Sequence, residues 1–551
     1  MADMPIESGA GPAAAQPGAS AGLFIRRSSG LVREFRPRDV FIFNTLGYSL
    51  GLVLAVVPTF VAGLWPAQNV LVIVTIGTLL TLFNALTYGY MSGIFPRAGG
   101  DYAFLTRTVS PGFGFVANWG FTWSQFLGLG LYAAFAVNFG LSIAFATIGY
   151  SLNNSTLISW STSTTHEWPT FLIGSAILVV VLGVLLLPSR YIRQIFLVSF
   201  VVAMIGTLAA VILMFTTSHA DFVSSFNSYM AAHGGGHTYD GIIARAHHAG
   251  MSVGSASVYG ALLALPLGYW IYIGFTYSAY IGGEVREPAR TQPRMILLTL
   301  GFAYVLYMIA FWRYYDVVGK DFTNSVVYLN GNTSAGSGIP VSPVLNFFTG
   351  LMTSNSILNI LMGVSFILWN SVLLFVIAMV CTRNMFAWSF DRIVPRQIAE
   401  VSEKNAPWVA TVIMFAITEV LLAIYTFTTF FNQVSNYIVI FSVAFWMGSW
   451  GAILLPYRRK EIFESAPVNV KRRIGGVPVL TLLGIGNLAL FSLILWGSFK
   501  TPGFSGPTGN KAILFVVAIY ASGLVVYAIA KTLQRRRGVD LDLLFSEIPP
   551  E

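Results

Sequence analysis

Twelve long apolar segments follow one another along this chain of 551 residues, and they restrict its fold more than any other feature. A helix needs about 20 apolar residues to cross a bilayer, whereas a barrel strand needs only about ten. Only 10% of the residues are charged, against about 25% in an average soluble domain. The sequence therefore predicts an all-α polytopic membrane protein. The segments lie at about residues 40–64, 69–95, 112–148, 170–188, 194–217, 257–281, 295–317, 356–381, 408–430, 435–456, 477–498 and 511–530.

The basic residues lie almost entirely on one side of these segments. With the N-terminus inside, 26 of the 31 Lys and Arg residues fall in cytoplasmic stretches. Membrane proteins orient themselves with such basic stretches in the cytoplasm. We therefore expect twelve spans in the cell membrane with both termini cytoplasmic. The same asymmetry accounts for the net charge of +9, so no nucleic-acid partner is expected.

The regions outside the apolar segments are short. Residues 1–24 are rich in Gly, Ala, Pro and Ser and lack a signal-peptide pattern. We expect a disordered cytoplasmic tail over residues 1–36, a transmembrane domain over 37–532 and a second cytoplasmic tail over 533–551. The single cysteine, Cys381, excludes disulfides within the chain and a cysteine-based metal site.

All six histidines fall on the predicted outer side, and four of them gather at His233, His237, His247 and His248. Paired histidines at short spacing can bind zinc or respond to pH. Because cysteines are missing there and acids are few, a solvated loop is favoured over a metal site. The outer stretches 149–169 and 218–256 are rich in Ser, Thr, Asn and Gly, which is typical of such loops.

Two apolar segments contain residues that interrupt helices. The first segment holds Asn-Thr-Leu-Gly-Tyr-Ser-Leu-Gly at residues 44–51, and the sixth holds Ile-Gly-Phe-Thr at 273–276. Glycines four residues apart are also typical of close packing between membrane helices. Interruptions at corresponding positions of two halves indicate instead a transporter whose binding site lies between inverted repeats.

Three further motifs follow these segments in order. Pro-Arg-Ala-Gly-Gly-Asp-Tyr occupies residues 96–102, Gly-Glu-Val-Arg-Glu-Pro occupies 283–288, and Thr-Arg-Asn-Met-Phe-Ala occupies 382–387, with Asp-Arg-Ile-Val-Pro at 391–395. Over about residues 36–460 the chain resembles the amino acid–polyamine–organocation (APC) superfamily of permeases. The resemblance implies a LeuT-type fold: twelve helices, a 5+5 inverted repeat plus two C-terminal helices, and helices 1 and 6 broken around a central site. It also implies transport by alternating access.

The resemblance places the substrate between the two breaks. A half-helix N-terminus offers N–H groups to a carboxylate, and unwound carbonyls accept hydrogen bonds from an ammonium group. The side that binds the carboxylate is expected at the first break, the amine side at the backbone of residues 273–275, and either Phe275 or Trp270 would close over the ligand. No acidic residue lies between Ala246 and Gly283, which favours a neutral substrate over a dibasic amino acid or polyamine. The expected substrate-binding residues are Gly47, Tyr48, Ser49, Leu50, Gly51, Trp270, Ile273, Gly274, Phe275 and Thr276.

The coupling ion is left open between H+ and Na+. Residues 195–217 contain no ionisable group, so the lysine that mimics sodium in some proton-coupled relatives is absent. Asn370 and Ser371 either contribute to a sodium site or only pack helices together. Glu419 is either a proton relay or a protonated residue at a helix or subunit contact. The residues expected at a cytoplasmic gate are Arg97, Gly99, Gly100, Asp101, Glu284, Arg286 and Arg383.

These features predict a secondary active transporter of amino acids or related organic amines, acting by symport or exchange. The alternative is a non-transporting sensor or accessory subunit with the same fold, with the histidine-rich outer stretch as its contact surface. An enzyme is not expected, because the sequence has no nucleotide-binding glycine loop, no zinc motif and no carboxylate pair placed in a pocket. The expected partners are a small-molecule substrate, a coupling ion and the lipid bilayer, without a cofactor or metal.

Overall fold

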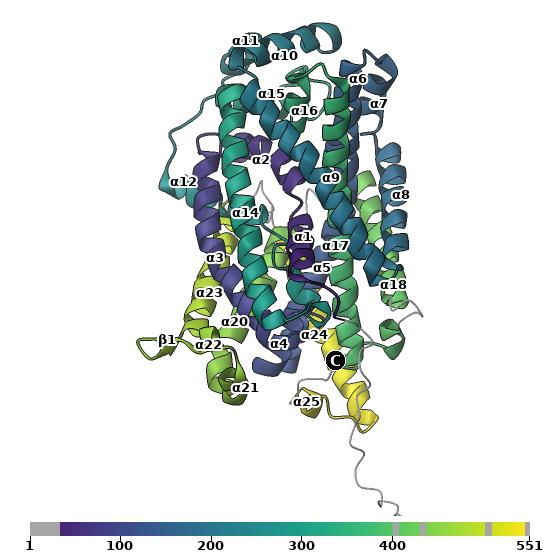
Figure 1. Cartoon of the computed structure of the whole chain (residues 1–551), viewed down its shortest axis with the longest axis vertical. Coiled ribbons are helices and arrows are strands. Elements are labelled where there is room, and N and C mark those ends of the chain that lie inside the picture. The colour runs from purple at the N-terminus through teal and green to yellow at the C-terminus, as the bar shows by residue number, and fades with distance from the viewer. Residues whose placement is uncertain (1–32, 401–406, 430–436, 502–509, 546–551) are drawn as a thin grey trace, which may run out of the picture.

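The computed structural model describes residues 33–400, 407–429, 437–501 and 510–545 as a bundle of helices (Figure 1). Within these residues, eleven helical spans are long and apolar enough to cross a membrane, and each matches one predicted apolar segment. The chain is thus an all-α polytopic membrane protein. The spans are α1 (Pro37–Gly47) with α2 (Leu50–Leu64), α3 (Val70–Ile94), α5 (Pro111–Phe135) continued by η1 (Ala136–Leu141) and α6 (Ser142–Ser151), α8 (Glu167–Leu185), α9 (Ser189–Thr216), α14 (Pro288–Val317), α17 (Ser356–Phe390), α18 (Trp408–Phe427), α20 (Tyr437–Arg458), α23 (Val479–Lys500) and α24 (Asn510–Arg536).

The sixth predicted segment differs from these eleven, because it forms no continuous helix. Two short helices, α12 (Val258–Leu263) and α13 (Leu265–Trp270), are followed by turns. Two 3₁₀ helices, η2 (Tyr277–Tyr280) and η3 (Gly282–Glu284), then lead to α14. The count of twelve spans and the inverted repeat stay predictions.

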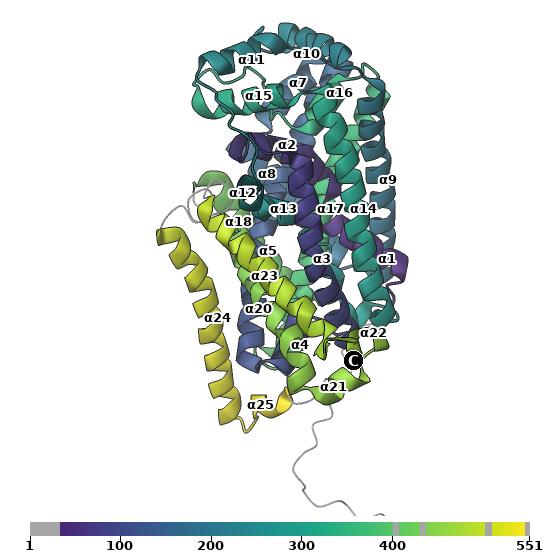
Figure 2. The same cartoon turned by 90° about the vertical axis from the view of Figure 1, so that its left-hand side faces the viewer.

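The two ends of the bundle carry different short elements (Figure 2). We call one end the basic end, because the stretches predicted to be cytoplasmic lie there; the other is the outer end. The basic end carries α4 (Asp101–Thr108), η4 (Arg396–Ala399), α21 (Lys460–Ser465), α22 (Val468–Lys471), the antiparallel strands β1 (Arg473–Ile474) and β2 (Val477–Pro478), and α25 (Leu541–Leu544). The outer end carries α7 (Ser155–Ser163), α10 (His219–His233), α11 (Tyr239–His248), α15 (Lys320–Asn332) and α16 (Leu345–Leu351).

The prediction of solvated outer loops was wrong, since α7, α10 and α11 occupy those stretches. Phe222 and Phe226 of α10 and Ile242 of α11 are fully buried, and both phenylalanine rings pack against Phe322 of α15. Residues four apart share one face of a helix, so these side chains form an apolar stripe within a polar composition. His233 ends α10, and His247 and His248 end α11. Among the described residues no group of three or more His, Cys, Asp or Glu is placed to hold a metal ion.

Burial separates the core of the bundle from its periphery. In the most apolar 18-residue stretch of each span, 94% is buried within the protein for α1–α2 but only 17% for α24. In a membrane, backbone that leaves a helix is tolerated only where protein surrounds it or a cavity adjoins it. The interruption in the first span is therefore surrounded by protein, which is where a membrane helix can be broken.

The first and the last described residues contact the basic end. The Phe35 N–H donates to the Glu284 carbonyl at 2.9 Å, and the Arg286 N–H donates to the Phe35 carbonyl at 2.9 Å. Residues 1–32, most of the predicted N-terminal tail, lie outside the described residues. At the other terminus, the Phe545 ring lies 4.9 Å from the Arg107 guanidinium and is itself buried. The described part of the predicted C-terminal tail thus docks on the basic end, and residues 546–551 lie outside the description.

Candidate functional site

The first span is interrupted at Tyr48 and Ser49, between α1 and α2. Ser49 has the left-handed backbone angles φ 49° and ψ 71°, which side chains other than glycine rarely adopt. Its hydroxyl donates to the Trp369 carbonyl of α17 at 2.8 Å and so fixes this strained residue. No side chain caps the N-terminus of α2, and the N–H groups of Leu50, Gly51 and Leu52 have no hydrogen-bond partner among the described residues. These groups form a set of unpaired donors at the α2 N-terminus.

The second interruption touches the first one directly. Gly274 has φ +114°, and a Cβ atom added there would lie 2.1 Å from the Gly47 carbonyl oxygen. A Cβ added to Gly47 would lie 2.9 Å from the Gly274 carbonyl oxygen. Both distances are shorter than real Cβ contacts, so only glycine at both positions lets the two unwound backbones meet. The two breaks, more than 200 residues apart in sequence, form one centre.

A small cavity of about 10 Å³ adjoins this centre. It is lined by Gly47 and Tyr48 from the first break, by Trp270 and Ile273 from the second, and by aromatic and aliphatic residues of other spans. The further lining residues are Leu52, Val53, Tyr132, Tyr277, Leu373, Ile377 and Tyr437. None of these side chains is an acid or a base. The size is close to the minimum for one water molecule, so the site is closed in this conformation.

Polar groups at this cavity remain available to a ligand. The hydroxyls of Tyr48 and Tyr437 are buried, and neither lies in hydrogen-bonding geometry with another described group, although Thr45 is close to the first and Tyr132 and Tyr277 are close to the second. The Tyr277 hydroxyl, by contrast, donates to the Gln125 side chain. An unpaired hydroxyl in an apolar interior costs free energy, and a ligand that binds it would recover that cost.

The structure brings together some of the predicted substrate-binding residues and separates others. Gly47, Tyr48, Trp270 and Ile273 line the cavity, and Gly274 forms the contact between the breaks. The remaining predicted residues take supporting positions: Ser49 bonds Trp369, Leu50 and Gly51 begin α2, and Phe275 and Thr276 are buried beside the second break. Of the two residues expected to close over a ligand, Trp270 lines the cavity and Phe275 does not.

Sequence reasoning missed the cavity residues of α5, α17 and α20, namely Tyr132, Leu373, Ile377 and Tyr437. Each lies in an ordinary apolar stretch and carries no local signal. Only the packing of α17 and α20 against α5 brings these helices around the cavity.

Comparison with known proteins decides the family. A family model described as amino acid permease matches residues 40–524, which is most of the chain. The chain belongs to the amino acid permease family. Two uncharacterised transporters, of Mycobacterium tuberculosis and Mycobacterium bovis, are each 23% identical to it over 407 residues. Each alignment covers 71% of this chain and 77% of the relative. The protein is thus a membrane transporter by family and by relatives.

Residues in and next to the three motifs of the permease contact one another at the basic end. A buried ion pair joins the Glu284 carboxylate to the Arg383 guanidinium at 2.8 Å, and a second joins Arg107 to Asp391 at 2.8 Å. Gly99 donates from its N–H to the Tyr280 carbonyl at 3.0 Å. A Cβ atom on Gly100 would lie 2.6 Å from the Tyr280 ring. The motif glycines are therefore required by close approach between residues 96–102 and the exit of the sixth segment.

Two predicted gate residues lie at the edge of this network. Arg286 is exposed, and its Nε donates to the Arg33 carbonyl at 3.0 Å, which is a backbone contact and not an ion pair. A guanidinium nitrogen of Arg97 donates to the Pro96 carbonyl at 3.1 Å.

Asp101 lies between α3 and α5, outside the membrane-spanning segments, and is fully buried. Its carboxylate accepts hydrogen bonds from Asn118 at 2.7 Å, Tyr280 at 3.0 Å and Tyr88 at 3.3 Å. Burial outweighs these three donors and raises the pKa of Asp101 to about 6. Folding therefore stabilises the protonated form of Asp101 relative to the unfolded chain.

The raised pKa of Asp101 makes its contribution to folding stability larger at low pH than at neutral pH. The folded state holds the Asp101 proton more tightly than the unfolded chain, so the contribution is present at low pH. It is lost as pH rises from the ordinary pKa of 3.8 through about 6. We expect the melting temperature of the wild type, relative to that of the isosteric Asp101→Asn variant, to fall by a few degrees between pH 4.5 and pH 7. Parallel melting curves over that range would contradict this assignment.

The candidate coupling residues of the permease lie in two places. Asn370 follows Trp369, whose carbonyl accepts a hydrogen bond from Ser49 at the first break. The Nδ2 of Asn370 donates to the Phe366 carbonyl at 2.7 Å, and the buried Oδ1 of Asn370 has no partner among the described residues. Ser371 is the next residue on α17 and is half-buried. Glu419 of α18 accepts a hydrogen bond from Ser175 of α8 at 2.6 Å. It is not among the residues that line the central cavity.

Proposed function

We propose that this permease carries a neutral amino acid across the cell membrane by alternating access, with both termini in the cytoplasm. The observation that carries the proposal is the contact between Gly47 and Gly274, which joins two interrupted segments beside a cavity without acidic or basic lining residues. Broken helices at one centre are the arrangement with which transporters bind small polar substrates inside a membrane.

The chemistry of the centre suits a zwitterion. The uncapped N-terminus of α2 supplies three free N–H groups and a positive dipole, both of which suit a carboxylate. The carbonyl of Ile273 accepts no hydrogen bond from a described residue and is available to an ammonium group. Aromatic and aliphatic side chains such as Trp270 and Leu373 then surround the rest of the substrate. A charged substrate side chain would have no counter-ion there, which supports a neutral one.

The closed cavity supports transport by conformational change. A space of about 10 Å³ is too small for an amino acid, so side chains or half-helices must move before a substrate binds. The buried ion pairs of Glu284 and Asp391 lie at the basic end, which is the predicted cytoplasmic side, and support its closure in this conformation. Opening would break or shift these contacts, and substrate binding would change the balance between the open and closed states.

We further propose that the transport is ion-coupled. The unpartnered Oδ1 of Asn370, close to the first break, supports a cation near residues 370 and 371. The Ser175 contact of Glu419 supports a role in holding α8 against α18.

Uptake into proteoliposomes tests the proposal. The purified permease is reconstituted and offered radiolabelled neutral, acidic and basic amino acids, polyamines and nucleobases, each with a proton gradient, a sodium gradient or neither. Saturable uptake of neutral amino acids is expected, and the gradient that drives it identifies the ion. Folded protein that binds one of these compounds but moves none of them would favour the sensor alternative, and uptake of another class alone would overturn the proposed substrate.

The free hydroxyl of Tyr48 allows a sharper test of the site. We expect Tyr48→Phe to raise the KM for the substrate about fivefold to tenfold, because a hydrogen bond is worth about 1 kcal/mol. Maximal uptake should change less. The matched control is Tyr520→Phe, whose hydroxyl already donates to the Ile440 carbonyl at 2.7 Å. Equal KM values in Tyr48→Phe and wild type would remove this hydroxyl from the binding site.

A further inference from the structure

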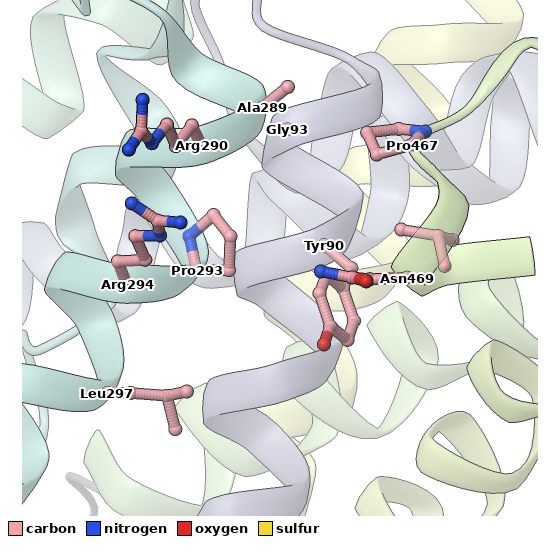
Figure 3. Close-up of a pocket in the computed structure, with 10 residues that line it drawn as sticks. Tyr90, Gly93, Ala289, Arg290, Pro293, Arg294, Leu297, Pro467 and Asn469 are labelled. Carbon is pink, nitrogen blue, oxygen red and sulfur yellow. The ribbon is translucent and has the colours of Figure 1, made fainter. Parts of the chain in front are cut away.

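A second and larger cavity, of about 320 Å³, opens at the basic end between α3, α14 and residues 467–470 (Figure 3). Its lining includes Tyr90 and Gly93 of α3, Pro293 and Leu297 of α14, and Val470 of α22. It shares no residue with the central cavity. The function proposed above therefore does not account for it.

Two arginines give this cavity its charge. Arg290 and Arg294 lie one turn apart on α14, both line the cavity and both are exposed. Figure 3 shows their guanidinium groups on the same side of the helix. Neither guanidinium forms a hydrogen bond or an ion pair with another described residue, in contrast to those of the buried Arg107 and Arg383. Two free guanidinium groups at this spacing suit a phosphate, which accepts several charge-assisted hydrogen bonds.

The same face of α14 continues into the membrane as an apolar stripe. Leu298 and Val305 are 54% and 55% exposed, and Ile309 follows them one turn later. Gly301 lies between Leu298 and Val305, and nothing lies within 4 Å of a Cβ atom added to it. Helical residues three and four apart share one face, so the arginines and the stripe form a single surface. A ligand on this surface would have a phosphate at the membrane boundary and hydrocarbon along the helix.

We propose that this surface binds an anionic phospholipid of the leaflet at the basic end. Its headgroup phosphate would lie between Arg290 and Arg294 at the cavity, and its acyl chains would follow Leu298, Val305 and Ile309. Basic pockets between membrane helices on the cytoplasmic side bind such headgroups. A free phosphate would use the arginines but leave the apolar stripe uncovered, so the lipid is the better match. The site lies on α14, directly after the exit of the sixth segment, where a bound lipid would bridge α14 and α3.

Native mass spectrometry of the full-length protein in detergent tests the proposal. The protein is titrated with phosphatidylglycerol, with phosphatidylcholine and with inorganic phosphate. We expect phosphatidylglycerol to bind more tightly than the other two. The Arg290→Gln/Arg294→Gln double variant should weaken its binding about tenfold or more. The matched control, Arg535→Gln/Arg536→Gln, removes two exposed arginines at the end of α24 that do not line the cavity, and it should change binding by less than about twofold.

A second variant keeps both arginines. Asn469→Trp places a large ring at an exposed position in the cavity lining and should also weaken phosphatidylglycerol binding. Melting temperatures measured without added lipid identify any variant that fails to fold. Unchanged binding in the arginine double variant, an equal loss in the α24 control, or inorganic phosphate that displaces phosphatidylglycerol completely would each overturn the proposal.

Discussion

The Gly274→Ala variant is expected to lose uptake entirely, or to fail to fold. The new Cβ atom would lie 2.1 Å from the Gly47 carbonyl oxygen and 2.7 Å from the Tyr48 nitrogen, both of which are backbone atoms. Backbone cannot rotate out of the way as a flexible side chain can. The φ angle of +114° adds strain that an alanine cannot relieve. The variant must therefore separate the two breaks, and with them the groups that would bind a substrate.

A graded series of alanine variants makes this test quantitative. Gly47→Ala creates a milder overlap, 2.9 Å from the Gly274 carbonyl oxygen, and should retain partial uptake. Gly301→Ala is the matched control, since nothing lies within 4 Å of its new Cβ atom. In the middle of a helix, Ala in place of Gly even stabilises by about 0.5–1 kcal/mol. Uptake and melting temperature should both be highest in Gly301→Ala, intermediate in Gly47→Ala and lowest in Gly274→Ala. Normal uptake by Gly274→Ala would show that the contact between the breaks is not needed for transport.

The positions of the membrane spans could be predicted because hydropathy is a local property. A bilayer requires about 20 apolar residues per helix, and that requirement is visible in the sequence without knowledge of packing. The two interruptions could also be placed, since Gly47, Ser49 and Gly274 are residues that leave a helix readily. Their contact, however, depends on how α1 packs against the turns between α13 and η2, and no local pattern gives that.

Loops were predicted at the outer end because the amino-acid composition was given more weight than the spacing of apolar residues. The stretch 218–256 has the Ser, Asn and Gly content of a loop, but Phe222, Phe226 and Tyr229 recur at helical spacing. Ser218 and Asp221 also form a capping box, with the Asp221 N–H donating to the Ser218 Oγ at 3.2 Å. Both signals are local and were present in the sequence.

The ion pairs between the motifs could not be predicted from the sequence. Arg107 lies just after the first motif and Asp391 begins the last one, and their ion pair joins residues 284 positions apart. Tyr102 donates to the same carboxylate oxygen at 2.9 Å, and Phe545 of the C-terminal segment covers the guanidinium. Burial of a charged pair requires that several elements arrive together, which a single sequence does not encode locally.

Breaking the other buried ion pair should cause a large loss of stability. Glu284 and Arg383 are 2% and 4% exposed, and two hydrogen bonds, at 2.8 and 3.4 Å, join them. Glu284→Gln would leave the Arg383 guanidinium buried without a counter-ion, at a cost of about 3–5 kcal/mol. Removing both charges, as Glu284→Gln/Arg383→Met, should recover part of that loss. Asp321→Asn is the control: its carboxylate meets His247 at 3.3 Å but is 55% exposed, so stability should change by less than about 1 kcal/mol.

The single cysteine of the chain provides a direct readout of the same change. Cys381 is fully buried on α17, two residues before Arg383, so a thiol reagent labels it only when the surrounding helices separate. The Glu284–Arg383 pair joins η3 to α17. If this pair keeps the closed state stable, Glu284→Gln should increase the labelling rate of Cys381 by the factor by which it destabilises that state. A destabilisation above about 1.4 kcal/mol corresponds to labelling at least about tenfold faster. The Asp321→Asn control should be labelled at the wild-type rate.

The melting temperature separates two roles of the Glu284–Arg383 pair. Faster labelling of Glu284→Gln with an unchanged melting temperature would indicate a local opening of the basic end, as a gate requires. Faster labelling with a proportionally lower melting temperature would indicate that the pair stabilises the whole fold. Wild-type labelling and wild-type melting together would show that the pair contributes nothing to closure.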